Sequence, residues 1–185
     1  MIVALLLVST LVVAGVAAGA WARARRTRRQ TVDALAMVPE LAGVAAPGAA
    51  ERMSATATAL SVRLGVNPRE AEHVAAAARL QGLADLGAGE DGVARARVVT
   101  QIATESGLSP SVTGLLNEVL TTSGGRAGRA AAAVRVAATF ERKRTEPHVA
   151  TAGALFATVS AHGAGNDRRA AAELVALMQE GIAPA

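Results

Sequence analysis

Residues 67–80 read Asn67-Pro-Arg-Glu-Ala-Glu-His-Val-Ala-Ala-Ala-Ala-Arg-Leu80, and this stretch decides the fold class. Asn67 can accept a hydrogen bond from the free amides of the following turn, which is the property of a good N-cap residue. Pro68 suits the first position of a helix, because no amide donor is needed there. The alanines that follow have the highest helix propensity of any residue. The stretch therefore predicts a helix that begins at Pro68.

Similar signals for the start and end of a helix recur along the rest of the chain. Ser109-Pro110 repeats the combination of a cap and a proline, and an apolar stripe from Leu174 to Met178 is followed by Gly181, where a left-handed residue would end a helix. The segments between these signals are long enough for helices, and none alternates apolar and polar residues as a strand would. The sequence predicts an all-α fold, with about six to eight helices after the first apolar segment.

The composition narrows the kinds of core and site that the chain can build. Hydrophobic residues make up 51% of the chain and aromatic residues only 2%, so the core must consist mainly of Ala, Val and Leu. The chain has no cysteine, which excludes disulfides, thiolate metal sites and cysteine nucleophiles.

The amino-terminal segment predicts a membrane anchor. Residues 2–21 carry no charge, and a helix of this length spans about 30 Å, the thickness of the hydrocarbon core. A cleaved signal peptide is the alternative, because Ala18-Gly19-Ala20 resembles a small-residue cleavage site. No basic residue precedes the apolar run, however, and five follow it, which favours an uncleaved helix with its amino terminus outside and the remainder of the chain in the cytoplasm. The expected membrane-interface residues are Trp21, Arg23, Arg25, Arg26, Arg28 and Arg29.

The basic excess is confined to this arginine cluster. Five of the 19 basic residues lie in it, and the remaining 14 are outnumbered by 15 acidic residues, so residues 31–185 carry a net charge of −1. A nucleic-acid-binding domain would need a basic stripe and stacking aromatics, so no nucleic-acid partner is expected. The cluster could instead contact anionic lipid headgroups, or act only as a determinant of topology.

Several segments together resemble the HD superfamily of metal-dependent phosphohydrolases, above all its HD-GYP branch, which hydrolyses cyclic di-GMP. The resemblance rests on Gly48-Ala-Ala-Glu-Arg-Met53, on Leu64-Gly65-Val66 at a helix end, on Ala75-Ala-Ala-Ala-Arg-Leu-Gln-Gly-Leu-Ala-Asp-Leu-Gly87, on Arg135-Val-Ala-Ala-Thr-Phe-Glu141 and on Ala171-Ala-Glu-Leu-Val175. These segments are similar to the family's Gly-His-Ser-Glu-Arg-Val, Leu-Gly-Leu, Ala-Ala-Leu-Leu-His-Asp-Ile-Gly, Val-Ala-Asp-x-Phe-Asp and Leu-Val-Glu-x-Leu. The resemblance implies an HD-like helical domain over residues 48–185. The apolar run and the arginine cluster predict an anchor over residues 1–22, followed by a basic juxtamembrane segment and connector over 23–47.

The same resemblance implies that the metal site has been lost. The family's metal ligands fall on Ala49, Gln81, Gly82 and Ala138, and its lysine falls on Asp85. Methyl groups, a glycine and a neutral amide cannot hold a catalytic divalent metal, which needs about three protein ligands. A degenerate domain without metal, cofactor or catalytic residues is therefore expected.

Other candidate sites have simpler explanations. The three histidines, His73, His148 and His162, include no pair at a metal-binding spacing, so surface or core positions are expected for them. The glycine-rich residues 87–92 lack the lysine of a phosphate-binding loop and predict a connector.

These observations lead to one functional expectation and two alternatives. The expectation is a membrane-anchored, catalytically inactive HD-like domain that binds another protein or a small ligand in signalling or regulation, with oligomerisation left open. One alternative is an HD-type phosphohydrolase acting on a nucleotide or cyclic dinucleotide. The other is a structural component of a membrane assembly.

Overall fold

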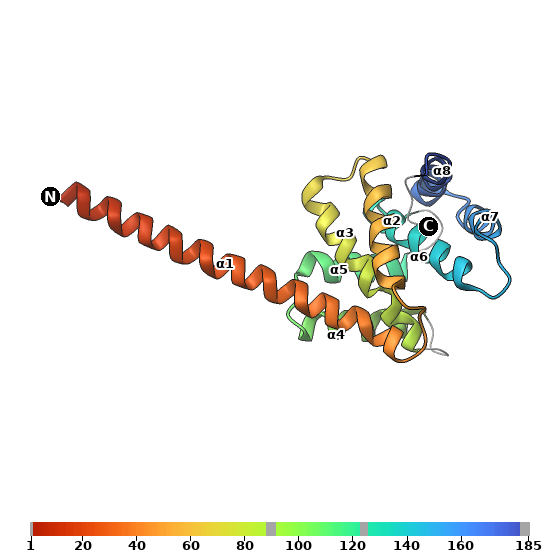
Figure 1. The fold of residues 1–185 in the computed structure, drawn as a ribbon, viewed down its shortest axis with the longest axis horizontal. Helices are drawn as coiled ribbons and strands as arrows, with labels where there is room; N and C mark the ends of the chain where they lie inside the picture. Colours follow the sequence, from red (N-terminus) through yellow and green to blue (C-terminus); the bar gives the residue numbers. More distant parts are fainter. Residues whose placement is uncertain (1, 88–91, 123–125, 182–185) are drawn as a thin grey trace.

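The computed structural model describes residues 2–87, 92–122 and 126–181, with side chains from Ala17 onward, and shows an all-helical fold (Figure 1). Across these described ranges there are helices and no strands, as the sequence predicts. The elements are α1 (Ile2–Leu41), α2 (Ala49–Arg63), α3 (Pro68–Leu80), the 3-10 helix η1 (Gln81–Gly87), α4 (Gly92–Glu105), α5 (Pro110–Thr121), α6 (Arg129–Thr145), α7 (Thr151–Ala161) and α8 (Gly165–Gln179).

The helix boundaries follow the local signals in the sequence. The Asn67 side chain accepts a hydrogen bond from the Arg69 amide at 2.9 Å, and α3 begins at Pro68. Ser109 Oγ accepts from the Val112 amide at 3.4 Å at the start of α5. Beyond α8, Gly181 has a φ of +68°, the left-handed conformation that favours glycine. All three predicted boundaries are confirmed.

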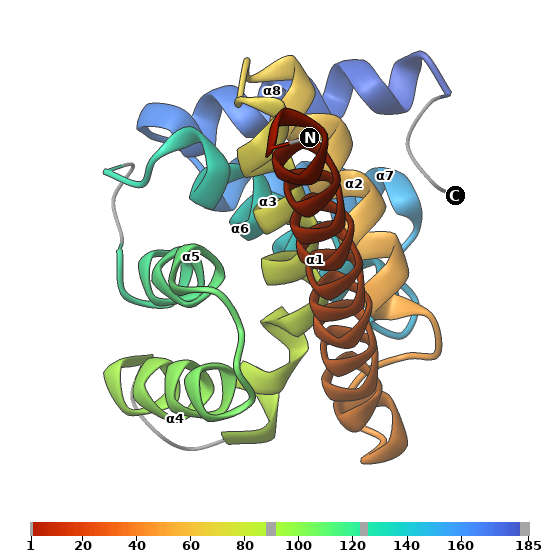
Figure 2. The same cartoon turned by 90° about the vertical axis from the view of Figure 1, so that its left-hand side faces the viewer.

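Helix α6 forms the centre of the domain. It contacts α2, α3, α5, α7 and α8, and its residues Ala130 to Ala138 are buried except for Arg135. Small side chains let neighbouring helices approach closely, while Phe140 supplies the largest buried side chain in the part of the chain that the structure describes. The view along α1 shows α4 and α5 on one side of this centre and α8 across another (Figure 2). The core is thus built mainly from Ala, Val and Leu, as the composition requires.

Helix α1 is one unbroken element that leaves the domain. Its carboxyl-terminal part packs on α3 and η1 and buries Val32, Ala36 and Pro39, whereas its amino-terminal part projects away from the other helices (Figure 1). The basic segment and much of the predicted connector are therefore helical. A turn at residues 42–48 links α1 to α2.

The predicted transmembrane helix over residues 1–22 is wrong. Among the residues whose side chains the structure describes, from Ala17 onward, no helix is both long and apolar enough to cross a membrane. Helix α1 does not end near Trp21 but continues through five arginines and two carboxylates to Leu41. The predicted topology depended on that span, and no interface role for Trp21 and the arginines follows from it.

Candidate functional site

The structure brings together two of the four positions expected to have held the metal. Gln81 of η1 and Ala138 of α6 line one pocket of about 290 Å³, and Asp85 lines it as well. Ala49 and Gly82 do not line this pocket, and both are buried elsewhere. The expected convergence of the four positions is therefore partial.

Ala49 lies at the first position of α2, beneath the turn from α1. The carboxylate of Glu40 accepts hydrogen bonds from the amides of Gly48 at 3.0 Å and Ala50 at 3.4 Å. A carboxylate at this end of a helix satisfies free amides and interacts favourably with the helix dipole. The space beside Ala49 is thus used for capping α2 from α1.

Gly82 is covered by α1. The Pro39 ring carbons lie 3.3 and 3.4 Å from the point that a Cβ atom on residue 82 would occupy. Pro39 itself is fully buried. A Cβ atom at position 82 would therefore contact Pro39 tightly, and the proline ring would have to shift by a few tenths of an ångström.

The pocket lies where η1, α4, the end of α5 and α6 meet His162, the residue that follows α7. Its lining is rich in polar and cationic side chains, and consists of Gln81, Ala84, Asp85, Arg95, Val119, Leu120, Thr121, Thr122, Arg135, Ala138, Thr139, Arg142 and His162. Its volume is at the small end of the range of about 300–1,000 Å³ that is typical of ligand pockets. The pocket suits a small ligand.

A buried polar network forms one wall of the pocket. His162 Nε2 lies 3.0 Å from Thr139 Oγ1, and His162 Nδ1 lies 3.6 Å from Asp167 Oδ2. The carboxylate favours a proton on Nδ1, in which case Nε2 accepts a hydrogen bond from the Thr139 hydroxyl. The network joins α6 to the first turn of α8.

Asp167, His162 and Thr139 are arranged in the order of the acid, imidazole and hydroxyl of a catalytic triad. The Asp167 carboxylate, however, pairs with Arg135. Arg135 Nη2 lies 3.2 Å from Asp167 Oδ2, closer than the imidazole does. Arg135 also donates to the Thr122 carbonyl at the end of α5. Because Asp167 is aligned to the guanidinium and lies beyond hydrogen-bond distance of His162, the arrangement holds Arg135 and His162 in place rather than activating Thr139.

Arginines outnumber carboxylates in the pocket lining, although Arg135 is paired with Asp167 and Arg142 with Asp85. Three arginines, Arg95, Arg135 and Arg142, line it with one carboxylate, that of Asp85, which lies 3.7 Å from Arg142 Nη1. Arg95 is half-buried and forms no ion pair with any residue that the structure describes. Guanidinium groups bind phosphate and carboxylate in a bidentate manner, so this lining can hold a small anion.

Two buried acceptors have no hydrogen-bond partner among the described residues. They are Gln81 Oε1, in the pocket wall, and Asp167 Oδ1, behind Arg135 and His162. Leaving a buried acceptor unpaired costs free energy, so each is a place for a donor supplied by water or by a ligand. A hydroxyl on the ligand could satisfy Gln81.

The other candidate residues lie apart from this pocket. His73 lines a groove between α1 and α3, and His148 lies in the connection from α6 to α7 with a φ of 68°. Within the ranges that the structure describes, no three His, Asp or Glu side chains come together to hold a metal ion. Of the glycine-rich residues 87–92, residues 88–91 lie outside the described ranges.

Sequence reasoning did not single out Arg95, Arg135, Thr139 or Asp167. Thr139 and Asp167 belong to different helices, and nothing in their spacing along the chain marks them as partners of His162. A usable signal was the position of Asp167 in the first turn of a predicted helix, where a carboxylate is favourable, together with Arg135 between the apolar residues 130–134 and 136–138.

Comparison of the chain with known protein families, with curated proteins and with solved structures finds no match in any of the three.

Proposed function

We propose that this chain is a degenerate HD-like helical protein that binds a small anionic ligand, a phosphate ester or carboxylate, in the pocket between η1, α5 and α6. The observation that carries the proposal is the set of three arginines around a pocket of about 290 Å³ with only Asp85 as a lining carboxylate. The HD-like part of the proposal rests on the resemblance and on the presence of Gln81 and Ala138 in the same pocket.

Binding without turnover is the activity that the residues favour. Hydrolysis by an HD-type centre needs metal ligands, and the corresponding positions carry Ala49, Gln81, Gly82 and Ala138. Arginines stabilise the charge of an anion but supply no nucleophile, and Thr139 lacks an imidazole base that is oriented by a carboxylate. A protein of this kind would act by reporting the concentration of its ligand to a partner.

The experiment measures binding of inorganic phosphate, citrate and adenosine monophosphate to the full chain by calorimetry at constant ionic strength in chloride. Arg95→Gln should weaken binding by about tenfold, because Arg95 is the pocket arginine without an ion-pair partner among the described residues. The matched control is Arg97→Gln, which removes the same charge from an exposed position on the same helix and outside this pocket.

Three outcomes would contradict the proposal. Equal loss in Arg95→Gln and Arg97→Gln would show that anions are attracted by net charge alone. Absence of binding by all three probes at millimolar concentration would exclude this pocket as an anion site. Retained manganese or iron, with phosphoester hydrolysis abolished by a chelator, would replace binding with the hydrolase alternative.

A further inference from the structure

A second candidate surface runs along α1, where this helix packs on α3. The face of α1 that buries Val32 and Ala36 against the domain continues toward the amino terminus. Arg29, Arg28 and Arg25 lie three, four and seven residues before Val32, and Trp21 lies four residues before Arg25. At these helical spacings the side chains share one stripe. The stripe extends past the edge of the domain.

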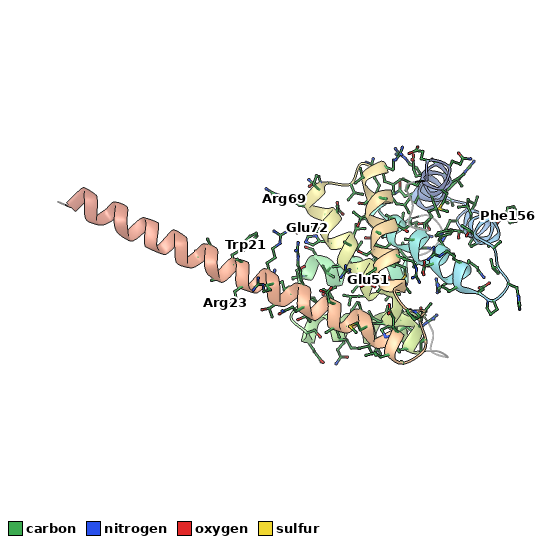
Figure 3. All side chains as sticks on the ribbon, viewed as in Figure 1. Trp21, Arg23, Glu51, Arg69, Glu72 and Phe156 are labelled. Carbon is green, nitrogen blue, oxygen red and sulfur yellow. The ribbon has the colours of Figure 1, made fainter. Side chains whose placement is uncertain are left out.

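Two ion pairs fix α3 alongside this stripe. Arg25 pairs with Glu72, and Asp33 pairs with Arg79, so α1 and α3 run parallel and each contributes one cation and one anion. Between the pairs lies a groove of about 510 Å³ that also reaches α2 and the start of α5. Figure 3 shows Trp21 on the side of α1 that faces α3, where Glu72 and Arg69 are labelled.

The groove has an apolar floor and a basic rim. Val32, Ala76, Leu108 and Val112 supply apolar lining, and Leu108 and Val112 are nearly buried. On the rim, Arg28 and Arg29 are exposed, and neither forms a hydrogen bond or ion pair with any described residue. Arg25 and Arg79 are neutralised by their partners, so the unpaired charge of the groove is that of the two neighbouring arginines.

Trp21 lies at the mouth of this groove with its ring largely uncovered. It is 65% exposed, and the Arg25 guanidinium lies 5.3 Å from its ring centroid. Tryptophan and arginine are the residues that most often carry the binding energy of protein interfaces. The exposed Trp21 ring extends the groove, which has an apolar floor and a basic rim. Together they have the composition of a protein-docking surface.

We infer that the groove between α1 and α3, together with Trp21, docks an acidic amphipathic helix of a partner protein. Such a helix would place its apolar stripe on the floor at Val32 and Leu108 and on the Trp21 ring. Its flanking carboxylates would pair with Arg28 and Arg29. Charge complementarity selects an acidic partner, and the apolar floor selects an amphipathic one.

The same features disfavour the other polyanionic partners. A polynucleotide would leave the apolar floor unused. A lipid surface is flat on this scale, whereas Leu108 in the floor is nearly buried. An amphipathic helix supplies both the apolar stripe and the flanking charges that the lining requires.

The test uses the intrinsic fluorescence of the full chain, because Trp21 is its one tryptophan and the chain has no tyrosine. The probe is a synthetic peptide of about 18 residues built from Leu, Glu and Ala, with Leu at helical spacing and Glu on the flanks. We expect saturable binding with a blue shift of the Trp21 emission. A peptide of the same composition in scrambled order should bind at least about tenfold more weakly, because it lacks the apolar stripe.

A pair of charge-reversal variants tests the arginines. R28E/R29E should weaken binding of the helical peptide by at least about tenfold, because it places carboxylates opposite those of the peptide. The matched control is R168E/R169E, which makes the same change at two exposed, adjacent arginines of α8, on the far side of the molecule from α1 (Figure 1). Circular dichroism verifies that both variants keep the helix content of the parent chain.

Several results would overturn the inference. Equal weakening by both variants would mean that the peptide responds only to net charge, and equal binding of the scrambled peptide would remove the amphipathic requirement. Tighter binding of a single-stranded oligonucleotide, or of phosphatidylglycerol vesicles, than of the helical peptide would assign the surface to nucleic acid or to lipid. None of these results bears on the anion pocket, which shares no lining residue with this groove.

Discussion

Pro39 of α1 packs directly against Gly82 of η1, with its Cγ and Cβ atoms 3.3 and 3.4 Å from the point where a Cβ atom on residue 82 would lie. In the resemblance to HD enzymes, position 82 is where the family carries a metal-binding aspartate. Here that position is covered by the last turn of α1. A glycine at position 82 allows this close approach of Pro39, whereas a Cβ atom there would press on the proline ring.

The first prediction is that Gly82→Ala destabilises the chain. The added methyl group would press on a fully buried proline, and overpacking of this kind costs about 1–3 kcal/mol. Chemical denaturation followed by circular dichroism measures the change. Pro39→Ala in the same background should return part of the loss, because the smaller side chain leaves room for the methyl group. Strictly additive effects of the two substitutions would show that the residues are not in contact.

The fold was predictable because its signals are local. A side-chain cap followed by proline fixes the start of α3 at Asn67-Pro68 and of α5 at Ser109-Pro110, and the left-handed Gly181 follows α8. Each of these signals acts within one helical turn, so no knowledge of tertiary packing is needed. At the amino terminus, the apolar run predicted an anchor helix that ends near Trp21, whereas α1 extends to Leu41. Nothing in the arginine cluster breaks a helix, and arginine is itself a good helix former, so α1 continues.

The candidate site was not predictable to the same extent, because it depends on contacts between distant segments. Gln81 and Ala138 were named from the resemblance, and they do share a pocket. Arg95 carries no local signal, and Asp167 shows only its favourable place in a first helical turn, since an arginine or aspartate on a helix is usually a solvated surface residue. Only the packing of α4 on α5 and η1, and of α8 on α6, gives these two residues a role.

The second prediction concerns the ion pair between α2 and α6. Arg52 Nε and Nη2 lie 2.8 and 2.6 Å from Glu141 Oε1, and the Glu141 side chain is only 6% exposed. Arg52→Met keeps the apolar part of the side chain but leaves a buried carboxylate without this partner, which costs roughly 3–5 kcal/mol at full burial. A value near the lower end is expected from thermal denaturation, because Arg52 is partly exposed and Arg144 lies 3.4 Å from Glu141.

The double variant R52M/E141L is the control for this pair. Replacing both charges with apolar side chains removes the unpaired carboxylate, so its stability should exceed that of Arg52→Met alone. Stability equal to or below that of the single variant would show that Glu141 depends on its other contacts rather than on Arg52.

The third prediction tests the cap that begins α3. Asn67→Ala removes the acceptor for the Arg69 amide and should cost about 0.5–2 kcal/mol of unfolding free energy. Asn67→Asp is the matched control, because it retains an acceptor oxygen and adds a favourable charge at the helix start. A loss in both variants of the same size would mean that the amide nitrogen of Asn67, rather than its oxygen, stabilises the turn.

The last prediction links stability to ligand binding through Asp167. Its carboxylate lies 3.2 Å from Arg135 Nη2, and the side chains are 4% and 18% exposed, so Asp167→Asn leaves a nearly buried guanidinium without its counter-charge. In chloride buffer this should destabilise the chain by roughly 3–5 kcal/mol. The freed positive charge faces the pocket, so the same variant should bind inorganic phosphate more tightly than the parent chain. Phosphate should then raise its melting temperature more than it raises that of the parent, because a ligand that binds only the folded state stabilises it in proportion to its affinity.

Asp85→Asn provides the comparison for this prediction. Asp85 is the lining carboxylate of the pocket, 3.7 Å from Arg142, and both side chains are substantially exposed, so its loss should change stability by no more than about 1 kcal/mol. It should nevertheless strengthen phosphate binding, because it removes a negative charge from the lining. The two variants therefore separate the structural role of a carboxylate from its effect on the pocket. Weaker phosphate binding by Asp167→Asn than by the parent would show that Asp167 positions Arg135 for the anion rather than competing with it.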